Sequence, residues 1–297
     1  MTVALVVATG ASVLAAGLHS ARAGDVAPVS DERSGADRVP RETSVKLLAS
    51  LRESWQAGVP KSSRACEASS YTYGSARGLS RVREAVRQGH RVTVLAVGSS
   101  STVGVGASEP SLAYPARLDA ALDRVLDGYP VDVVARGVSG EAAETMSERI
   151  KLEVARNRPQ LVIWQVGTNA AIQRMPTAKL ADLIERTVAW LAAKNVDVVL
   201  VDPQFTDKLS QDAHYVDIVR TIFATALKSD VAIVRRYSAM SEYASRGMLS
   251  AYLARDQFHH NDLGYQCLTE HVLGTLVHEL ARAEVQARQF ASRQDGE

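Results

Sequence analysis

The chain has 297 residues, enough for one large domain or two small ones. Hydrophobic residues make up 46% and charged residues 23%, a composition that allows a sizeable globular core. The formal net charge of +1 argues against a dedicated nucleic-acid-binding surface. The arginines that cluster at Arg77, Arg81, Arg83 and Arg87 are therefore interpreted as a solvent-exposed helix face.

The N-terminus has the pattern of a secretory signal peptide. Residues 4–18 are apolar or small, and Ala21-Arg22-Ala23 after them is typical of a cleavage site. The apolar run is shorter than the ~20 residues that span a bilayer. We expect residues 1–23 to be removed on export to the periplasm or the medium, which leaves no stable membrane span. An uncleaved anchor and a misplaced start are the alternatives, because no Lys or Arg precedes the apolar run.

Two cysteines, Cys66 and Cys267, make a disulfide candidate. An even number of cysteines in an exported protein favours a bridge, here between the segment before the first strand and the C-terminal helix. Two separate buried thiols are the alternative. A zinc site is not expected, since there is no CxxC or HxxxH pattern.

The chain then divides into an extension and one alternating α/β region. Residues 24–40 show no periodicity and are typical of a linker. Helices are expected over 43–57 and 79–88, with a loop over 58–77. Strands are expected at 92–97, 131–135, 161–166, 196–201 and 231–234, and further helices at 114–126, 141–155, 177–193, 212–227 and 261–287.

Such alternation predicts a five-stranded parallel sheet that helices cover on both faces. We assign residues 24–87 to a linker and N-terminal extension, 88–288 to one α/β/α domain and 289–297 to a flexible tail.

Four short segments are expected to meet at one edge of this sheet, because right-handed crossovers place all strand exits together. They provide a hydroxyl (Ser100), an unshielded backbone N–H (Gly140), an amide (Asn169), an imidazole (His259) and a carboxylate (Asp256).

This set of groups matches the needs of ester hydrolysis. A serine hydroxyl needs a base to take its proton, and histidine does this best near neutral pH. Asp256 precedes His259 by three residues, so one turn can bring its carboxylate to the ring Nδ1. The Ser100 N–H, the Gly140 N–H and the Asn169 amide would hold the charged oxygen of the tetrahedral intermediate. No cofactor and no metal is implied.

Each of these residues also has a structural interpretation. Ser100 could be only a loop hydroxyl or a helix N-cap, and its neighbours Ser99 and Ser101 compete for the role of nucleophile. Asn169 could cap the following helix, and Gly140 could serve only a left-handed turn.

His259 competes with its neighbour His260, but the spacing from Asp256 favours His259. Asp256 could cap the final helix, for which Asn261 is better placed.

The segments resemble the four sequence blocks of the SGNH hydrolases, also called GDSL-type esterases and lipases. Gly98-Ser-Ser-Ser-Thr102 is similar to the G-D-S-x-[ST] block, and Gly137-Val-Ser-Gly140 to the second block. Val166-Gly-Thr-Asn169 is similar to G-x-N-D, and Asp256-Gln-Phe-His259 to D-x-x-H. The resemblance covers residues 92 to about 275. It implies a flavodoxin-like three-layer α/β/α sandwich and the same roles for the five residues.

The sequence departs from the family pattern at four positions. Ser99 stands where the family has Asp, Ala170 where an Asp often follows the Asn, Arg136 where an Asn is frequent, and His260 where a Pro is frequent. None of these changes removes a group that the mechanism requires, but they suggest a different lining around the serine.

The sequence therefore predicts an exported serine esterase that hydrolyses carboxylic esters through an acyl-enzyme. Its partner is a small-molecule or glycan ester substrate, and location together with the resemblance favours O-deacetylation of a polysaccharide. One alternative is an O-acyltransferase that acts on a glycan with the same triad. Another is a non-catalytic carbohydrate-binding module on the same fold. The sequence does not indicate the oligomeric state.

Overall fold

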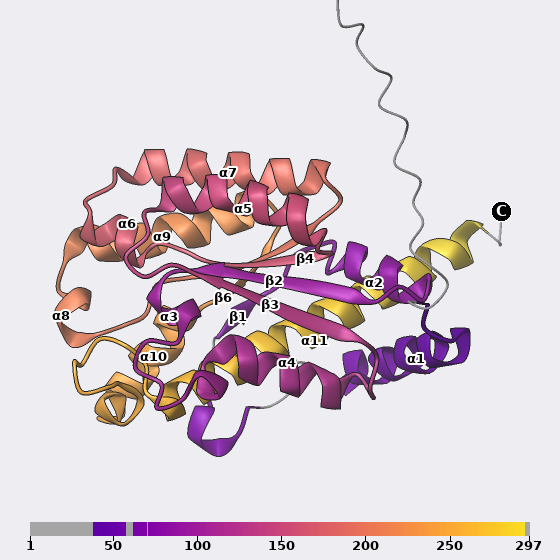
Figure 1. Cartoon of the computed structure of the whole chain (residues 1–297), viewed down its shortest axis with the longest axis horizontal. Helices are drawn as coiled ribbons and strands as arrows, with labels where there is room; N and C mark the ends of the chain where they lie inside the picture. Colours follow the sequence, from indigo (N-terminus) through magenta and orange to yellow (C-terminus); the bar gives the residue numbers. More distant parts are fainter. Residues whose placement is uncertain (1–37, 58–61, 70, 295–297) are drawn as a thin grey trace, which may run out of the picture. The chain divides into compact units, whose positions relative to one another are not determined.

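The computed structural model describes residues 38–57, 62–69 and 71–294. The predicted signal peptide, residues 1–23, and residues 24–37 of the predicted linker lie outside the described residues. The described residues form a sheet with helices on both of its faces (Figure 1). No helix in this part of the chain is long and apolar enough to cross a bilayer.

Within the described residues the sheet contains six strands, in the order β1-β6-β5-β4-β2-β3. They are β1 (Thr72–Tyr73), β2 (Val92–Gly98), β3 (Val131–Gly137), β4 (Leu161–Gln165), β5 (Asp197–Val201) and β6 (Ala232–Val234). The five parallel strands expected from the sequence are β2 to β6.

The strand count of five is one too low. The segment 58–77, expected to be a loop, contains β1, which pairs antiparallel with β6. A strand of two residues is too short to show any hydrophobic alternation.

Helices cover both faces of the sheet. One face carries α5 (Ala143–Asn157), α7 (Thr177–Ala193) and α9 (Ala213–Lys228). The other carries α1 (Arg41–Ala57), α2 (Ser80–Arg87), α4 (Tyr114–Val125) and α11 (Asp262–Gln294) (Figure 1). Val94 and Ala96 of β2 join the core under α4 and α11, whereas Leu95 joins the core under α5 and α7. Burial on both faces explains why the strand sequences are continuously apolar.

Shorter elements lie between these. They are the helices α3 (Ser100–Val103), α6 (Thr168–Ile172), α8 (Asp207–Ser210) and α10 (Arg236–Ser245), and the 3-10 turns η2 (Arg64–Cys66), η3 (Pro110–Leu112) and η4 (Leu249–Tyr252).

The C-terminal helix α11 is longer than expected. Asn261 precedes it, and its Oδ1 accepts the N–H of Gly264 at 3.0 Å, as a helix cap does. The helix continues past the expected end at Ala287, through much of the segment 289–297 that was expected to be a flexible tail. Residues 288–294 contain neither Gly nor Pro, so nothing in the sequence stops the helix there.

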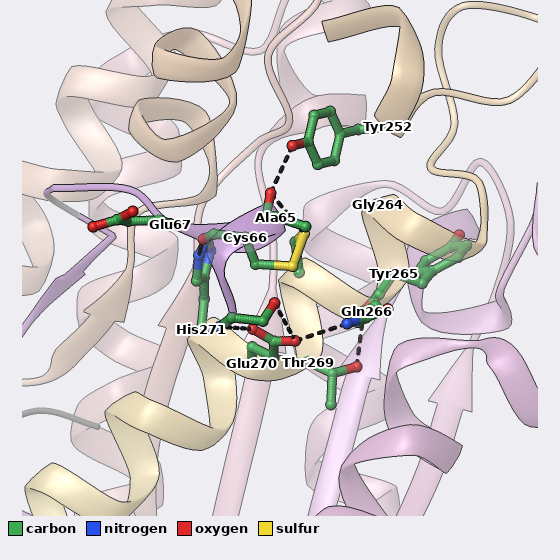
Figure 2. The surroundings of a disulfide bond; sticks show 12 residues. Ala65, Cys66, Glu67, Tyr252, Gly264, Tyr265, Gln266, Thr269, Glu270 and His271 are labelled. Carbon is green, nitrogen blue, oxygen red and sulfur yellow. Dashed lines mark hydrogen bonds between the residues drawn. A yellow bond between two sulfur atoms is a disulfide. The ribbon is translucent and has the colours of Figure 1, made fainter. Parts of the chain in front are cut away.

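The predicted disulfide between Cys66 and Cys267 is confirmed (Figure 2). It joins η2 to α11, and the two Cα atoms lie 4.8 Å apart. The carbonyl of Cys66 accepts the hydroxyl of Tyr243 at 3.0 Å and lies 2.8 Å from Nε2 of His271. The bond and these contacts fix the segment before α2 on the C-terminal helix.

The arginine cluster is only partly the exposed face that was expected. Arg77, Arg81 and Arg87 are exposed. The side chain of Arg83 is only 17% exposed and pairs with Glu284 of α11 at 2.9 Å. Glu284 lies 201 residues away in the sequence, so helix periodicity could not reveal this pair.

Candidate active site

The turn after β2 presents Ser100 at the carboxyl edge of the sheet. β2 ends at Gly98, and α3 begins at Ser100. No side chain fits at Gly98, where a Cβ would lie 2.1 Å from Oγ1 of Thr102 and 2.7 Å from Oε1 of Gln165. The N–H of Thr102 donates to the carbonyl of Ser99 at 3.0 Å and closes the turn. In parallel α/β sheets, ligands bind at this edge.

The structure brings the three predicted triad residues together. Ser100 Oγ lies 3.0 Å from Nε2 of His259, and Nδ1 of His259 lies 2.6 Å from Oδ2 of Asp256. Hydroxyl, imidazole and carboxylate thus form one hydrogen-bonded series, in which a proton can pass from the serine to the ring.

The other two serines of the run face elsewhere. Ser99 is buried and directs its hydroxyl to Oε1 of Gln165 at 3.3 Å. The hydroxyl of Ser101 accepts a hydrogen bond from Nη1 of Arg236 at 3.1 Å. Of the three, Ser100 is the one that contacts His259.

Asp256 is held by the turn that leads to His259. Its Oδ1 accepts the backbone N–H groups of Phe258 at 3.0 Å and of His259 at 2.9 Å, which leaves Oδ2 for the ring. Burial by itself would raise the pKa of Asp256, but the hydrogen bonds from the ring and backbone of His259 and from Phe258 hold that pKa below its usual range. At neutral pH Asp256 is therefore a carboxylate, the form that keeps the proton on Nδ1 and stabilises an imidazolium.

The oxyanion candidates lie on the two neighbouring strand exits. In the sheet register Gly98 is opposite Gly137 of β3, and Val97 is opposite Trp164 of β4. The loops that carry Gly140 and Asn169 therefore flank the turn that carries Ser100.

Gly140 and Asn169 meet at one backbone segment. Gly140 has a φ of 75°, the left-handed region that glycine adopts without strain. Nδ2 of Asn169 donates to the carbonyl of Glu141 at 3.0 Å. An amide nitrogen carries two hydrogens, so one remains for a ligand oxygen. Gly167, not Asn169, occupies the cap position of α6.

An ion pair that the sequence does not reveal supports this loop. Arg149 of α5 pairs with both oxygens of Glu141, with 2.8 Å between Nε and Oε1. It also donates to the carbonyls of Arg136 at 3.0 Å and Gly98 at 3.3 Å. Arg149 thus joins the ends of β2 and β3 to the loop that carries Gly140 and Glu141. Arg149 and Glu141 are eight apart in the sequence, beyond the spacing of three or four residues that marks an ion pair on a helix face.

Two further polar residues that contact the turn with Ser99, Ser100 and Ser101 were not predicted either. Oε1 of Gln165 accepts the N–H of Ser99 at 3.1 Å, and a polar residue at the end of an apolar strand was the available signal. Arg236 is 2% exposed, donates to Ser101 and donates from Nε to the carbonyl of Asp202 at 3.0 Å. No pattern in the sequence distinguishes Arg236 from a surface arginine.

His260 points away from the site and into the protein. It is 3% exposed and lies beside the ring of Tyr265, at 5.4 Å between centroids. Burial, helped by the charges of Arg236, His259 and His271, holds the pKa of His260 well below 6.5.

His260 is therefore expected to make the fold sensitive to acid. As the pH falls below 6.5 the unfolded chain binds a proton that the folded chain does not, so the contribution of this group to stability is complete above 6.5 and is lost below it. Between about pH 6 and about pH 5, the free energy of unfolding should fall about 1 kcal/mol per pH unit more steeply in the wild type than in His260→Leu. Denaturant unfolding followed by circular dichroism measures both slopes, and equal slopes would contradict the expectation.

The family model that matches this chain and the fold of similar solved structures together identify the SGNH hydrolase fold, the fold of a class of carboxylic ester hydrolases. The model of the non-GDSL lipase-like family matches residues 65–282, and the chain belongs to this family. The family name agrees with Ser99, which stands at the position of Asp in the G-D-S-x-[ST] block.

Solved structures with this fold include TesA, with a TM-score of 0.54 and 23% identity over 62% of this chain and 97% of that one. A lipase/acylhydrolase from Enterococcus faecalis has a TM-score of 0.52 and 20% identity over 61% and 93%. The acetyl xylan esterase AlAXEase has a TM-score of 0.53 and 18% identity over 61% and 98%. At such identities the likeness shows the fold alone. No curated protein matches the sequence.

Removing the amide of Asn169 is expected to slow ester hydrolysis. Asn169→Ala should lower kcat roughly 100- to 1000-fold, the usual loss for one oxyanion donor, and should change KM little. Gln173→Ala is the matched control, because Nε2 of Gln173 binds the same loop at the carbonyl of Gly140, 3.3 Å away. Steady-state kinetics on a soluble ester measure both variants. Equal losses in the two variants would mean that Asn169 only supports the loop.

Proposed function

We propose that the protein hydrolyses carboxylic esters through Ser100, His259 and Asp256, with an acyl-enzyme as intermediate. One observation carries the proposal: the hydrogen-bonded series in which 3.0 Å separates Ser100 Oγ from His259 Nε2 and 2.6 Å separates His259 Nδ1 from Asp256 Oδ2. Such a series is what a weak hydroxyl nucleophile needs at neutral pH.

In acylation, Ser100 Oγ attacks the ester carbonyl carbon while Nε2 of His259 takes the hydroxyl proton. The carbonyl electrons move to the oxygen, where the N–H groups of Ser100 and Gly140 and the amide of Asn169 stabilise the charge. Asp256 stabilises the imidazolium that forms. When the intermediate collapses, the ester C–O bond breaks and the leaving alcohol takes the proton from His259.

Deacylation repeats these steps with water. Nε2 of His259 takes a proton from the water as its oxygen attacks the acyl carbon. The bond to Ser100 Oγ then breaks, and the serine recovers its proton from His259. The products are a carboxylic acid and the free enzyme.

For the substrate we propose a short acyl ester, such as acetate, on a cell-surface or secreted polysaccharide. The apolar run at residues 4–18 supports export, and so does the disulfide, since such bonds persist in oxidising compartments. Among proteins that share the fold, AlAXEase is named as an acetyl xylan esterase and CEX as an esterase active on acetylated mannans.

Covalent labelling tests the nucleophile. A fluorophosphonate should label the wild type once and should not label Ser100→Ala, because the reagent reacts with an activated serine hydroxyl. An unlabelled wild type would favour the carbohydrate-binding alternative.

A substrate panel tests the acyl group and the acceptor. Acetylated glycans and small acetate esters should react faster than long-chain esters, with free acetate as the product. Transfer of the acetyl group to an added acceptor sugar would favour the O-acyltransferase alternative.

N-terminal sequencing tests the signal peptide. The sequence of the secreted protein should begin at Gly24, and a protein from the periplasm whose sequence begins at Met1 would contradict cleavage.

A further inference from the structure

A groove lies between α1, α2 and α11, away from the catalytic residues. Its volume is about 960 Å³, and residues of all three helices line it. It lies where α2 leads into the start of β2, whereas Ser100 follows the other end of that strand. A strand of seven residues, as β2 is, spans about 20 Å, so the groove is separate from the active site.

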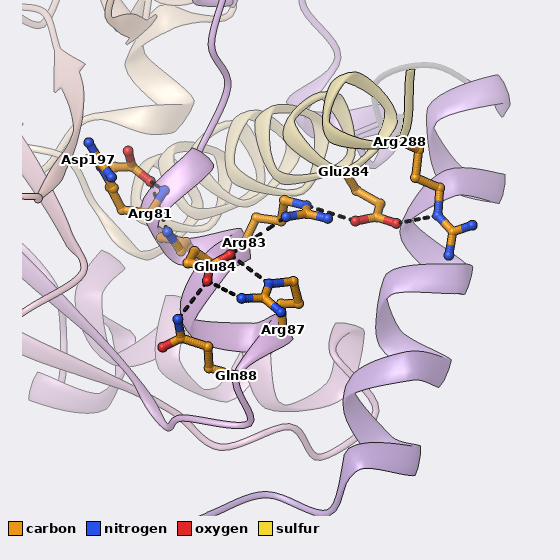
Figure 3. A network of polar contacts seen from close by, with 9 residues as sticks. Arg81, Arg83, Glu84, Arg87, Gln88, Asp197, Glu284 and Arg288 are labelled. Carbon is orange, nitrogen blue, oxygen red and sulfur yellow. Dashed lines mark hydrogen bonds and ion pairs between the residues drawn. The ribbon is translucent and has the colours of Figure 1, made fainter. Parts of the chain in front are cut away.

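The charged residues of the groove are almost all arginines. Arg38, Arg41, Arg83, Arg87 and Arg288 line it, and Glu284 is the acidic residue among the lining. The whole chain carries a formal net charge of only +1, so positive charge is concentrated here. Figure 3 shows Arg83, Arg87 and Arg288 around the carboxylates of Glu84 and Glu284.

The carboxylate of Glu284 already has three arginine partners. Its side chain is 1% exposed and accepts Nη1 of Arg52 at 2.9 Å, Nε of Arg83 at 2.9 Å and Nε of Arg288 at 3.0 Å. Glu84 is a second carboxylate in this cluster, since its Oε2 lies 3.8 Å from Nη1 of Arg83. Two negative charges therefore face the four guanidinium groups of Arg52, Arg83, Arg87 and Arg288, which do not lose their protons in proteins. Arg87 has its own partner, Glu84, at 2.8 Å. The arginines around Glu284 therefore leave an excess of positive charge in a concave, partly buried part of the groove.

Two more arginines add to this surplus. Arg38 and Arg41 are exposed, and within the described part of the chain neither side chain has an ion pair or a hydrogen bond. Val39 and Leu48 also line the groove. The groove thus contains both a small apolar surface and guanidinium groups that are free to bind a ligand.

We propose that this groove binds a soluble ligand that carries two or more phosphate-type oxyanions. Guanidinium forks match the oxygens of such groups in pairs and keep their charge at any physiological pH. The volume is in the range of small-molecule sites. Because the arginines line a concavity, a ligand that enters the groove meets more of them than a flat bilayer surface does. The proposal does not depend on the chemistry at Ser100.

Calorimetric titration of the full chain with inorganic tripolyphosphate tests the proposal. The wild type should bind one equivalent saturably, and more weakly as sodium chloride is raised. Arg38→Gln/Arg41→Gln should bind roughly 100-fold more weakly, about tenfold for each charge-assisted hydrogen bond that the change removes. These changes leave the pairs of Glu284 intact. Arg124→Gln is the matched control, since Arg124 is an exposed arginine of α4 outside the groove.

The Ser100→Ala variant should keep the wild-type affinity, and the double arginine variant should keep the wild-type esterase activity. Inorganic phosphate should bind more weakly than tripolyphosphate, because it has a single oxyanion group. The absence of saturable binding, or equal affinity in the double variant and the wild type, would overturn the proposal. So would binding to phosphatidylcholine vesicles that contain phosphatidylglycerol without binding to tripolyphosphate, because it would indicate a membrane surface.

Discussion

Replacing Ser100 with alanine is expected to lower kcat for ester hydrolysis by roughly 10⁴- to 10⁶-fold, the loss typical of a triad nucleophile. Ser100 is the serine of its run whose hydroxyl contacts His259, at 3.0 Å. Initial rates on a soluble acetate ester measure the loss, and circular dichroism checks that the fold is kept.

The neighbouring serines provide matched controls for this prediction. Ser99→Ala and Ser101→Ala remove hydroxyls that bind Gln165 and Arg236, not His259, so each should cost far less activity than Ser100→Ala. The double variant Ser100→Ala/His259→Ala should be no slower than Ser100→Ala alone, because the two residues act as a unit. Full loss in Ser99→Ala with activity kept in Ser100→Ala would reassign the nucleophile.

Removing the disulfide is expected to have the largest effect on stability. Cys66→Ser/Cys267→Ser should lower the free energy of unfolding by about 2–5 kcal/mol, because the bond closes a long loop and so restricts the unfolded chain. The two cysteines are 201 residues apart, for which loop entropy alone predicts about 5 kcal/mol. The shift of the urea unfolding midpoint measures this loss.

Wild-type protein treated with a reductant is the control for the serine variants. If the bond is the cause, the reduced wild type and the double variant should unfold at the same urea concentration. An unchanged midpoint after reduction would mean that packing around Tyr243 and His271 already holds this segment without the bond.

Local sequence patterns predicted the helices and strands that a run of a few neighbouring residues defines. The apolar runs at β2 to β6 and the helix spacing between them were sufficient for the parallel sheet, since the inner strands β2, β4 and β5 are buried on both faces. They failed at β1, which exists only through its pairing with β6. They also misplaced the end of α11, because no stop residue marks it.

The features of the candidate active site also separate into those that the sequence predicts and those that only the tertiary structure decides. The spacing of Asp256 and His259 and the order of the glycine-rich strand exits are written in the sequence, because a single turn or a strand end determines them. Contacts between distant segments decided the rest: which of three serines faces the imidazole, that Arg149 and Arg236 support the loops, and that Arg83 pairs with Glu284. Such contacts leave no periodicity in the chain, because tertiary packing alone brings their partners together.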